Sequence, residues 1–371
     1  MEELFNINWD KLLDTFREDK CVLFLGSGAY QAPGGMDLEE GLSQWLDANN
    51  PNHPLIRLYN SDGFFLLRKR RYQSRIITKI RKFYHQSFPE TERRFKKVAE
   101  IPFSMIFTLT PDNILARTFD TYHFPYYSDF YFRHKKAPER FEVPSPEKPL
   151  IYNLLGNIDE PDSLVLTHRD FFSYLDSVFN GNSMNKDILQ ELENAECYIF
   201  LGLPYERWYF QLLLRVLSMH SDRLSEVDRF AFKEIENQEL HELYTGEFNI
   251  QFIPTEISSF IDVLHNKCKD GGLLKTPENV FLDLINSEDI SPEKIRNLLA
   301  KNKIGEAINS LRLFLDHFYR SSPEIKNDLI IIQGRFYSLK QRIIRGTINP
   351  RDSQVENRQI VDILLRMIPQ M

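Results

Sequence analysis

Cysteine is scarce in this chain. Three cysteines occur among 371 residues, namely Cys21, Cys197 and Cys268, and no two of them form a C-x-x-C pair. A disulfide framework normally uses an even number of cysteines, and a zinc site needs clustered ligands. Two of the three cysteines lie inside apolar segments. We therefore expect buried thiols and no metal cofactor.

Long apolar runs and an excess of basic residues are also missing. No apolar run approaches the roughly 20 residues that a membrane-spanning helix requires. The start Met1-Glu2-Glu3 lacks the basic stretch of a secretory signal. We therefore expect a cytoplasmic protein without a membrane partner. The net charge of −7 gives no reason to expect a nucleic-acid partner.

One segment departs from this acidic balance. Residues 68–97 are rich in Arg and Lys, with apolar residues interleaved at helical spacing. The pattern is typical of the solvated face of amphipathic helices. It is also compatible with an electrostatic patch for an acidic partner, an oligomer neighbour or nucleic-acid phosphate. The sequence leaves these alternatives open.

The most informative feature that is present is an apolar run ending in a glycine-rich turn. Residues 21–25 are all apolar or Cys, and Gly26-Ser27-Gly28-Ala29 follows directly. The run predicts a buried strand. Glycines lack a Cβ, so the backbone N–H groups of such a turn can approach a phosphate closely. The segment favours a nucleotide-binding α/β domain, with an ordinary tight turn as the alternative.

Four further segments follow in a recognisable order, at residues 103–117, 150–158, 164–174 and 197–208. Together with the glycine turn they resemble the sirtuin-like NAD-binding family over roughly residues 10–265. The resemblance implies an α/β fold with a Rossmann-type parallel sheet, and NAD or ADP-ribose as the bound nucleotide. It also implies that a Gly-rich strand end, followed downstream by an aromatic residue and an Arg, closes the nucleotide site. The implied site residues are Gly26, Ser27, Gly28, Ala29, Thr108, Thr110, Asp112, Gly156 and Gly202.

Two departures from the family pattern fall where its chemistry is done. The family reads Thr-Thr-Asn-Tyr-Asp where this chain has Thr108-Leu-Thr-Pro-Asp112, so Thr110 replaces the asparagine. The family reads Leu-His-Gly where this chain has Leu154-Leu155-Gly156, so Leu155 replaces the general-base histidine. General acid–base help is worth about two to four orders of magnitude in rate. We therefore expect no conventional catalytic residue at these degenerate positions.

A nearby imidazole is a possible substitute for the missing base. His168 is the obvious candidate, although Thr167 looks like a helix N-cap with Asp170 completing a capping box. This context favours a surface histidine in the first turn of a helix. Classical deacetylases of the family also carry a four-cysteine zinc ribbon, which has no counterpart here, so protein deacetylation is disfavoured.

Periodicity predicts further elements of the first domain. An amphipathic helix is expected from Leu38 to Leu46, with Trp45 in the core, and another from Trp208 to Leu217. Residues 119–149 are rich in Phe, Tyr and Pro and predict irregular structure. A final strand is expected over residues 248–253, followed by a helix over residues 258–268.

The remainder of the chain has helical patterns only. We expect a sirtuin-like domain over residues 1–272, a linker over 273–290 and a helical domain over 291–371. Ser291 is a candidate N-cap, Gly346 a candidate C-cap, and the helices are expected at 294–300, 304–320, 324–345 and 352–367. The expected core of this four-helix unit comprises Leu298, Ala307, Leu311, Leu315, Leu329, Phe336, Leu339, Ile343, Ile360, Ile363 and Leu364.

Short motifs in this helical domain resemble an effector-associated domain, the small adaptor fused to enzymes in bacterial conflict systems. They include Ile295-Arg-Asn-Leu-Leu-Ala300, Gln333-Gly-Arg-Phe336 and Glu356-Asn-Arg358. The resemblance implies a protein partner with a matching domain. A private dimerisation module is the alternative, and we expect a homo-oligomer from the family resemblance.

Two classes of function follow. The first is a catalytically degenerate sirtuin-like module that binds NAD or ADP-ribose, or acts as a scaffold, in a bacterial anti-phage defence assembly. The second is an active NAD-hydrolysing defence effector with unconventional catalytic residues. Thr110 and Leu155 favour the first class.

Overall fold

The computed structural model describes residues 7–132, 143–179, 185–218, 227–277, 292–301, 303–318, 323–344 and 347–368. The chain divides into two compact units near Pro277. In the first unit, the Lys275 N–H donates to the Glu100 carbonyl at 2.8 Å, so this unit continues beyond residue 272. Among the described residues, no helix is long and apolar enough to cross a membrane.

The first unit is built on a parallel sheet, which confirms the predicted fold class. Within the described ranges its strand order is β5-β6-β4-β1-β7-β8-β9, and every neighbouring pair is parallel. The strands are β1 Cys21–Leu25, β4 Met105–Thr108, β5 Tyr127–Phe130, β6 Leu150–Asn153, β7 Cys197–Leu201, β8 Asp228–Phe232 and β9 Gln251–Ile253.

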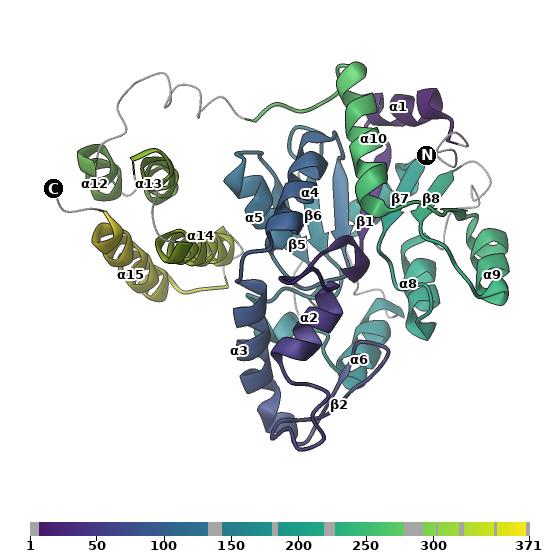
Figure 1. Ribbon diagram of the computed structural model, residues 1–371, viewed down its shortest axis with the longest axis horizontal. Helices are drawn as coiled ribbons and strands as arrows, with labels where there is room; N and C mark the ends of the chain where they lie inside the picture. Colours follow the sequence, from purple (N-terminus) through teal and green to yellow (C-terminus); the bar gives the residue numbers. More distant parts are fainter. Residues whose placement is uncertain are drawn as a thin grey trace. The chain divides into compact units, whose positions relative to one another are not determined.

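The central strands β1, β4, β6 and β7 are buried on both faces, which explains why they are mainly apolar runs. Side chains alternate along a strand. Leu23 of β1 therefore packs in the apolar cluster on one face, and Phe24 packs in the cluster on the other. The sheet runs through the middle of the unit (Figure 1).

Helices cover the two faces in separate groups. The first cluster includes side chains from α1 Trp9–Arg17, α2 Leu38–Trp45, α3 Gln73–Tyr84, α4 Pro89–Glu100, α5 Ile114–Thr121 and α10 Ile257–Asp270. The second includes side chains from α6 His168–Phe179, α7 Lys186–Asn194, α8 Trp208–Ser218 and α9 Gln238–Phe248. A hairpin of β2 Ile56–Tyr59 and β3 Phe65–Leu67 lies with α2, α3 and α6 below the sheet in Figure 1.

Three expectations for this unit need correction. Trp45 is not a core residue, because it is 50% exposed and its indole N–H donates to the Lys79 carbonyl at 3.2 Å. Residues 127–130 form the edge strand β5 within a region expected to be irregular. The final strand is shorter than residues 248–253, because Phe248 ends α9 and the left-handed backbone of Asn249 separates that helix from β9.

The second unit contains the four predicted helices. They are α12 Pro292–Ala300, α13 Ile304–Phe318, α14 Pro323–Ile344 and α15 Pro350–Met367. Asn349 caps α15 by accepting from the Asp352 N–H at 2.9 Å. The candidate caps Ser291 and Gly346 lie outside the described residues.

An apolar cluster joins these helices. Most of the expected core residues are buried in it or pack against it. Ile343 is the exception, because 46% of its surface is exposed near the end of α14. The apolar face of that helix therefore ends before Ile343.

Candidate functional site

The predicted site residues gather at the carboxyl ends of the central strands. β1 lies between β4 and β7, and the chain builds the sheet outward from β1 in both directions. In open α/β sheets, ligands bind outside the carboxyl ends of the strands at such a switch point. Gly26 follows β1, Thr110 and Asp112 follow β4, and Gly202 follows β7.

The two glycine turns after β1 and β7 interlock. The Gly26 N–H donates to the Leu201 carbonyl at 2.8 Å, and the Gly28 N–H donates to the Gly202 carbonyl at 3.0 Å. A Cβ on Gly26 would lie 2.2 Å from the Gly202 oxygen, and one on Gly202 would lie 2.1 Å from the Ala29 nitrogen. The close approach of the two backbones therefore requires glycine on both sides.

Three N–H groups of this turn, those of Gly26, Gly28 and Ala29, already have partners in the structure. Besides the bond from Gly28, the Ala29 N–H donates to the Gly26 carbonyl at 3.0 Å. Outside the turn, the Arg94 guanidinium donates to the Ala29 carbonyl at 2.6 Å. The described polar contacts of this turn with the surrounding helices are therefore made by the Ala29 carbonyl, to α4, and by the Ser27 side chain, to α2.

The segment after β4 is held by a buried asparagine. Asn153, at the end of β6, donates from Nδ2 to the carbonyls of Thr110 and Asp112, at 2.9 Å each. The Thr108 hydroxyl donates to the Thr110 carbonyl at 3.1 Å, and the Thr110 hydroxyl donates to the Tyr30 hydroxyl at 2.9 Å. These contacts bring the segment after β4 against the residue that follows the glycine turn.

Asp112 is a buried carboxyl group in this segment. Its Oδ1 accepts from the Ile114 N–H at 2.7 Å, and its Oδ2 has no hydrogen-bond partner among the described residues. Burial raises the pKa of Asp112 above its usual range, although hydrogen bonding by Thr110 and the Ile114 N–H opposes this change. Asp112 can therefore hold a proton more readily than an exposed carboxyl group.

Leu155 lies in an apolar environment. It is 8% exposed and belongs to the cluster on the second face of the sheet, together with Phe64 and Phe171. The next residue, Gly156, has a φ of +90°, and a Cβ there would lie 2.2 Å from the Ser163 carbonyl oxygen. The turn after β6 thus combines a required glycine with a side chain that has no acid–base chemistry.

A polar cluster joins the glycine turn to the loop after β7. The Ser27 hydroxyl donates to Glu39 Oε1 at 2.7 Å, and Arg207 Nη2 donates to Glu39 Oε2. Arg207 Nη1 also donates to the Tyr209 hydroxyl at 3.2 Å. Burial alone would lower the pKa of Arg207, but the hydrogen bond to Glu39 and the charges of Tyr209 and Glu39 raise it. The guanidinium is therefore a permanent positive charge beside the turn.

His168 is the first residue of α6, as the capping pattern predicts. The Asp170 N–H donates to the Thr167 hydroxyl at 3.2 Å, and the Thr167 N–H donates to Asp170 Oδ2 at 3.0 Å. The His168 side chain is 42% exposed, and its Nε2 lies 3.2 Å from Asn60 Nδ2. Its polar partners among the described residues, Asn60 and Asp62, belong to the β2–β3 loop. The described contacts therefore do not place His168 against Leu155.

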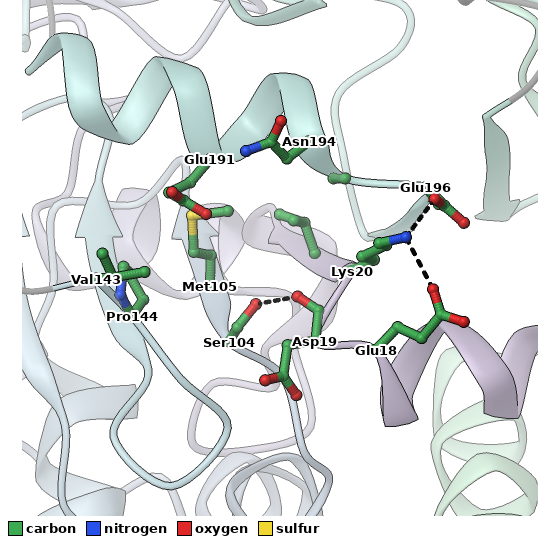
Figure 2. Close-up of a pocket in the computed structure, with 12 residues that line it drawn as sticks. Glu18, Asp19, Lys20, Ser104, Met105, Val143, Pro144, Glu191, Asn194 and Glu196 are labelled. Atoms are coloured by element: carbon green, nitrogen blue, oxygen red, sulfur yellow. Dashed lines mark hydrogen bonds and ion pairs between the residues drawn. The ribbon is translucent and has the colours of Figure 1, made fainter.

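A cavity of about 440 Å³ lies at the opposite, amino edge of the sheet. Figure 2 shows Lys20 between Glu18 and Glu196, at 2.8 and 2.6 Å, with Asp19 and Glu191 nearby. Burial and the charge of Glu147 raise the pKa of Asp19. This excess of carboxylates disfavours a phosphate group, and the cavity contains none of the predicted site residues.

The three cysteines are buried free thiols, as expected. Cys21 and Cys197 face each other in the register of β1 and β7. Among the described residues, no group of three or more His, Cys, Asp or Glu side chains could hold a metal ion.

Comparison with known families identifies both parts of the chain. The model of the SIR2-like domain matches residues 104–253, and the model of effector-associated domain 11 matches residues 290–371. The chain therefore joins a SIR2-like domain to an effector-associated domain, which confirms the predicted fusion. No curated protein matches it. The SIR2-like match includes the segments after β4, β6 and β7 but not the turn at Gly26 to Ala29.

Sequence reasoning missed two polar residues of this region. Glu39 is one of two acidic residues in the first turn of α2, where acidic residues are common because they favour the helix dipole. Asn153 ends an apolar strand and carries no motif. Only the fold reveals their partners.

Proposed function

We propose that this protein is a catalytically degenerate sirtuin-like module that binds NAD or ADP-ribose at the carboxyl edge of its sheet. We further propose that its effector-associated domain recruits it to a protein with a matching domain in a bacterial anti-phage assembly. The observation that carries the loss of catalysis is the buried Leu155 after β6, where the family has its general base. The place of the Gly26 to Ala29 turn at the switch point of the sheet supports retained nucleotide binding.

The test is incubation of the purified full-length protein with NAD. Calorimetry would measure binding, and chromatography would measure release of nicotinamide. We expect binding of NAD or ADP-ribose without release of nicotinamide. Nicotinamide release would contradict the loss of catalysis, whereas failure to bind either nucleotide would leave a scaffold role.

One observation favours the second candidate, an NAD-hydrolysing effector. Asp112 is buried and protonates more readily than an exposed carboxyl group, and Thr110 and Tyr30 lie beside it. Such a carboxyl group is a candidate proton acceptor. If the wild-type protein cleaves NAD, Asp112→Asn should abolish cleavage while keeping nucleotide affinity. Unchanged cleavage in this variant would exclude Asp112 from the chemistry.

A further inference from the structure

The carboxylate of Glu39 bridges a hydroxyl on the glycine turn and a guanidinium on the loop after β7. One oxygen accepts from the Ser27 hydroxyl on the turn at 2.7 Å, and the other accepts from the Arg207 guanidinium on the loop after β7. Both oxygens of one anion are therefore bound by donors from two separate segments. Hydroxyl and guanidinium donors are also the groups that bind a phosphate in proteins.

The negative charge of Glu39 extends beyond this bridge. Tyr59, on the hairpin, has a pKa well above its ordinary value because of burial and, next, because of the charge of Glu39. A phosphate entering this region would meet the same negative charge. It would also find Arg207 already paired, since the side chains of Arg207 and Glu39 are 19% and 25% exposed while bonded to each other.

We propose that Ser27 and Arg207 form an anion-binding site that Glu39 fills in the ligand-free protein, and that a nucleotide phosphate binds by displacing Glu39. This inference rests on the proposed nucleotide site and adds a regulatory contact to it. Glu39 acts as an internal competitor, because its carboxylate uses the donors that a phosphate oxygen would use. Since α2 carries Glu39 in its first turn, displacement of the carboxylate would also free the start of that helix from the turn.

The test compares single charge changes in the full-length protein. Glu39→Gln removes the charge and keeps an acceptor, whereas Glu40→Gln makes the same change at the adjacent exposed residue. Arg207→Met removes the guanidinium. Calorimetry would measure the affinity of each variant for ADP-ribose and for inorganic pyrophosphate, and thermal unfolding would show that each variant is folded.

We expect Glu39→Gln to bind ADP-ribose about tenfold more tightly than the wild type, which corresponds to about 1.4 kcal/mol. Glu40→Gln should match the wild type, and Arg207→Met should bind at least about tenfold more weakly. Tighter pyrophosphate binding by Glu39→Gln alone would support the anion site even if ADP-ribose does not bind.

The two proposals fail in different ways. If the wild type binds ADP-ribose and Glu39→Gln binds it no more tightly, the internal competitor is wrong and the nucleotide site stands. If ADP-ribose binds to no variant but pyrophosphate binds to Glu39→Gln, the nucleotide site is wrong and the anion site stands. If neither ligand binds to any variant, both proposals are wrong.

Discussion

At the scale of single residues, the glycines show how one residue type can serve two purposes. The sequence suggests that Gly26 and Gly28 leave room for a phosphate. In the structure, Gly26 and Gly202 leave room for each other's backbones, because a Cβ on either residue would lie within 2.2 Å of the other turn. Their packing role therefore exists whether or not a nucleotide binds.

Gly26→Ala should destabilise the first unit. The added methyl group would overlap the Gly202 carbonyl, and overpacking of this kind costs about 1–3 kcal/mol. Gly246→Ala is a matched control, since a Cβ on this exposed glycine of α9 meets no atom within 4 Å. The control should be neutral or more stable by about 0.5–1 kcal/mol. Chemical denaturation would measure both, and equal stability of Gly26→Ala and wild type would contradict the packing argument.

Lys275 provides a prediction about pH. Its Nζ is buried without a hydrogen-bond partner among the described residues, and it lies 5.4 Å from the centre of the Phe119 ring. Burial lowers the pKa of Lys275 to about 7, although the charge of Glu147 opposes this. At pH values between this pKa and the ordinary pKa of 10.5, the unfolded chain binds more protons than the folded one. The free energy of unfolding therefore rises with pH in this range.

Lys275→Met should remove this dependence. At pH 6 the variant should be more stable than the wild type, because it avoids burying a charge. By pH 10 the advantage should shrink, since the folded lysine is then neutral and the pH is close to the ordinary pKa of 10.5 at which the unfolded lysine loses its proton. Thermal unfolding of both proteins across this range is the measurement. A constant difference between them would show that Lys275 titrates normally.

At the scale of elements, the observed helices match the predictions from the sequence better than the observed strands do. The periodic apolar positions of α3, including Ile76, Ile80 and Phe83, are buried as a helical face requires. The basic residues of this region act partly through structural contacts, since Arg81 donates to the Ile158 carbonyl at 2.8 Å. Strand β5 was missed because an edge strand of four residues has too little pattern to distinguish it from a loop.

The capping box of α6 gives a prediction at this scale. Thr167→Ala removes a side chain that accepts from the Asp170 N–H and donates to the Asp170 carboxylate. We expect a loss of about 1 kcal/mol in unfolding free energy. Thr167→Ser keeps the hydroxyl and should recover most of the loss. If the serine and alanine variants are equally unstable, the hydroxyl does not cap this helix.

At the scale of the whole molecule, the chain consists of two units with separate apolar cores. The members of each apolar cluster belong to a single unit. A unit of this kind is expected to fold alone. The division also separates the proposed tasks, since the proposed nucleotide site lies in the first unit and the proposed adaptor is the second.

Removal of residues 278–371 should therefore leave a folded α/β unit. We expect unchanged affinity for ADP-ribose and loss of binding to a protein with a matching effector-associated domain. Circular dichroism, calorimetry and co-purification would measure these three properties. Partner binding by the shortened protein would contradict the adaptor role.

In the full chain, Leu311→Ala is a milder change. Leu311 is a buried residue of α13, so its truncation should lower the free energy of unfolding of the second unit alone by about 2–5 kcal/mol.

The sequence by itself determined the class of each unit. Its apolar runs predict buried strands, and its helical periodicity predicts the four C-terminal helices. Its ordered motifs resemble the sirtuin-like family and thereby imply the parallel sheet of the SIR2-like domain. These features depend on short stretches of chain, so local sequence patterns are enough to predict them. Because parallel strands end at the same edge of a sheet, the predicted fold also implies that Gly26 to Ala29, Thr110 and Gly202 lie at one edge.

Only the tertiary structure decided what these residues contact. The pairing of Gly26 with Gly202, the Asn153 bonds to the segment after β4 and the Glu39 bridge from Ser27 to Arg207 all join segments distant in sequence. The exposure of Trp45 and Ile343, which lie at the ends of their own helices, likewise depends on tertiary packing. A local pattern contains no information about such partners, because each contact is set by the packing of whole elements against one another.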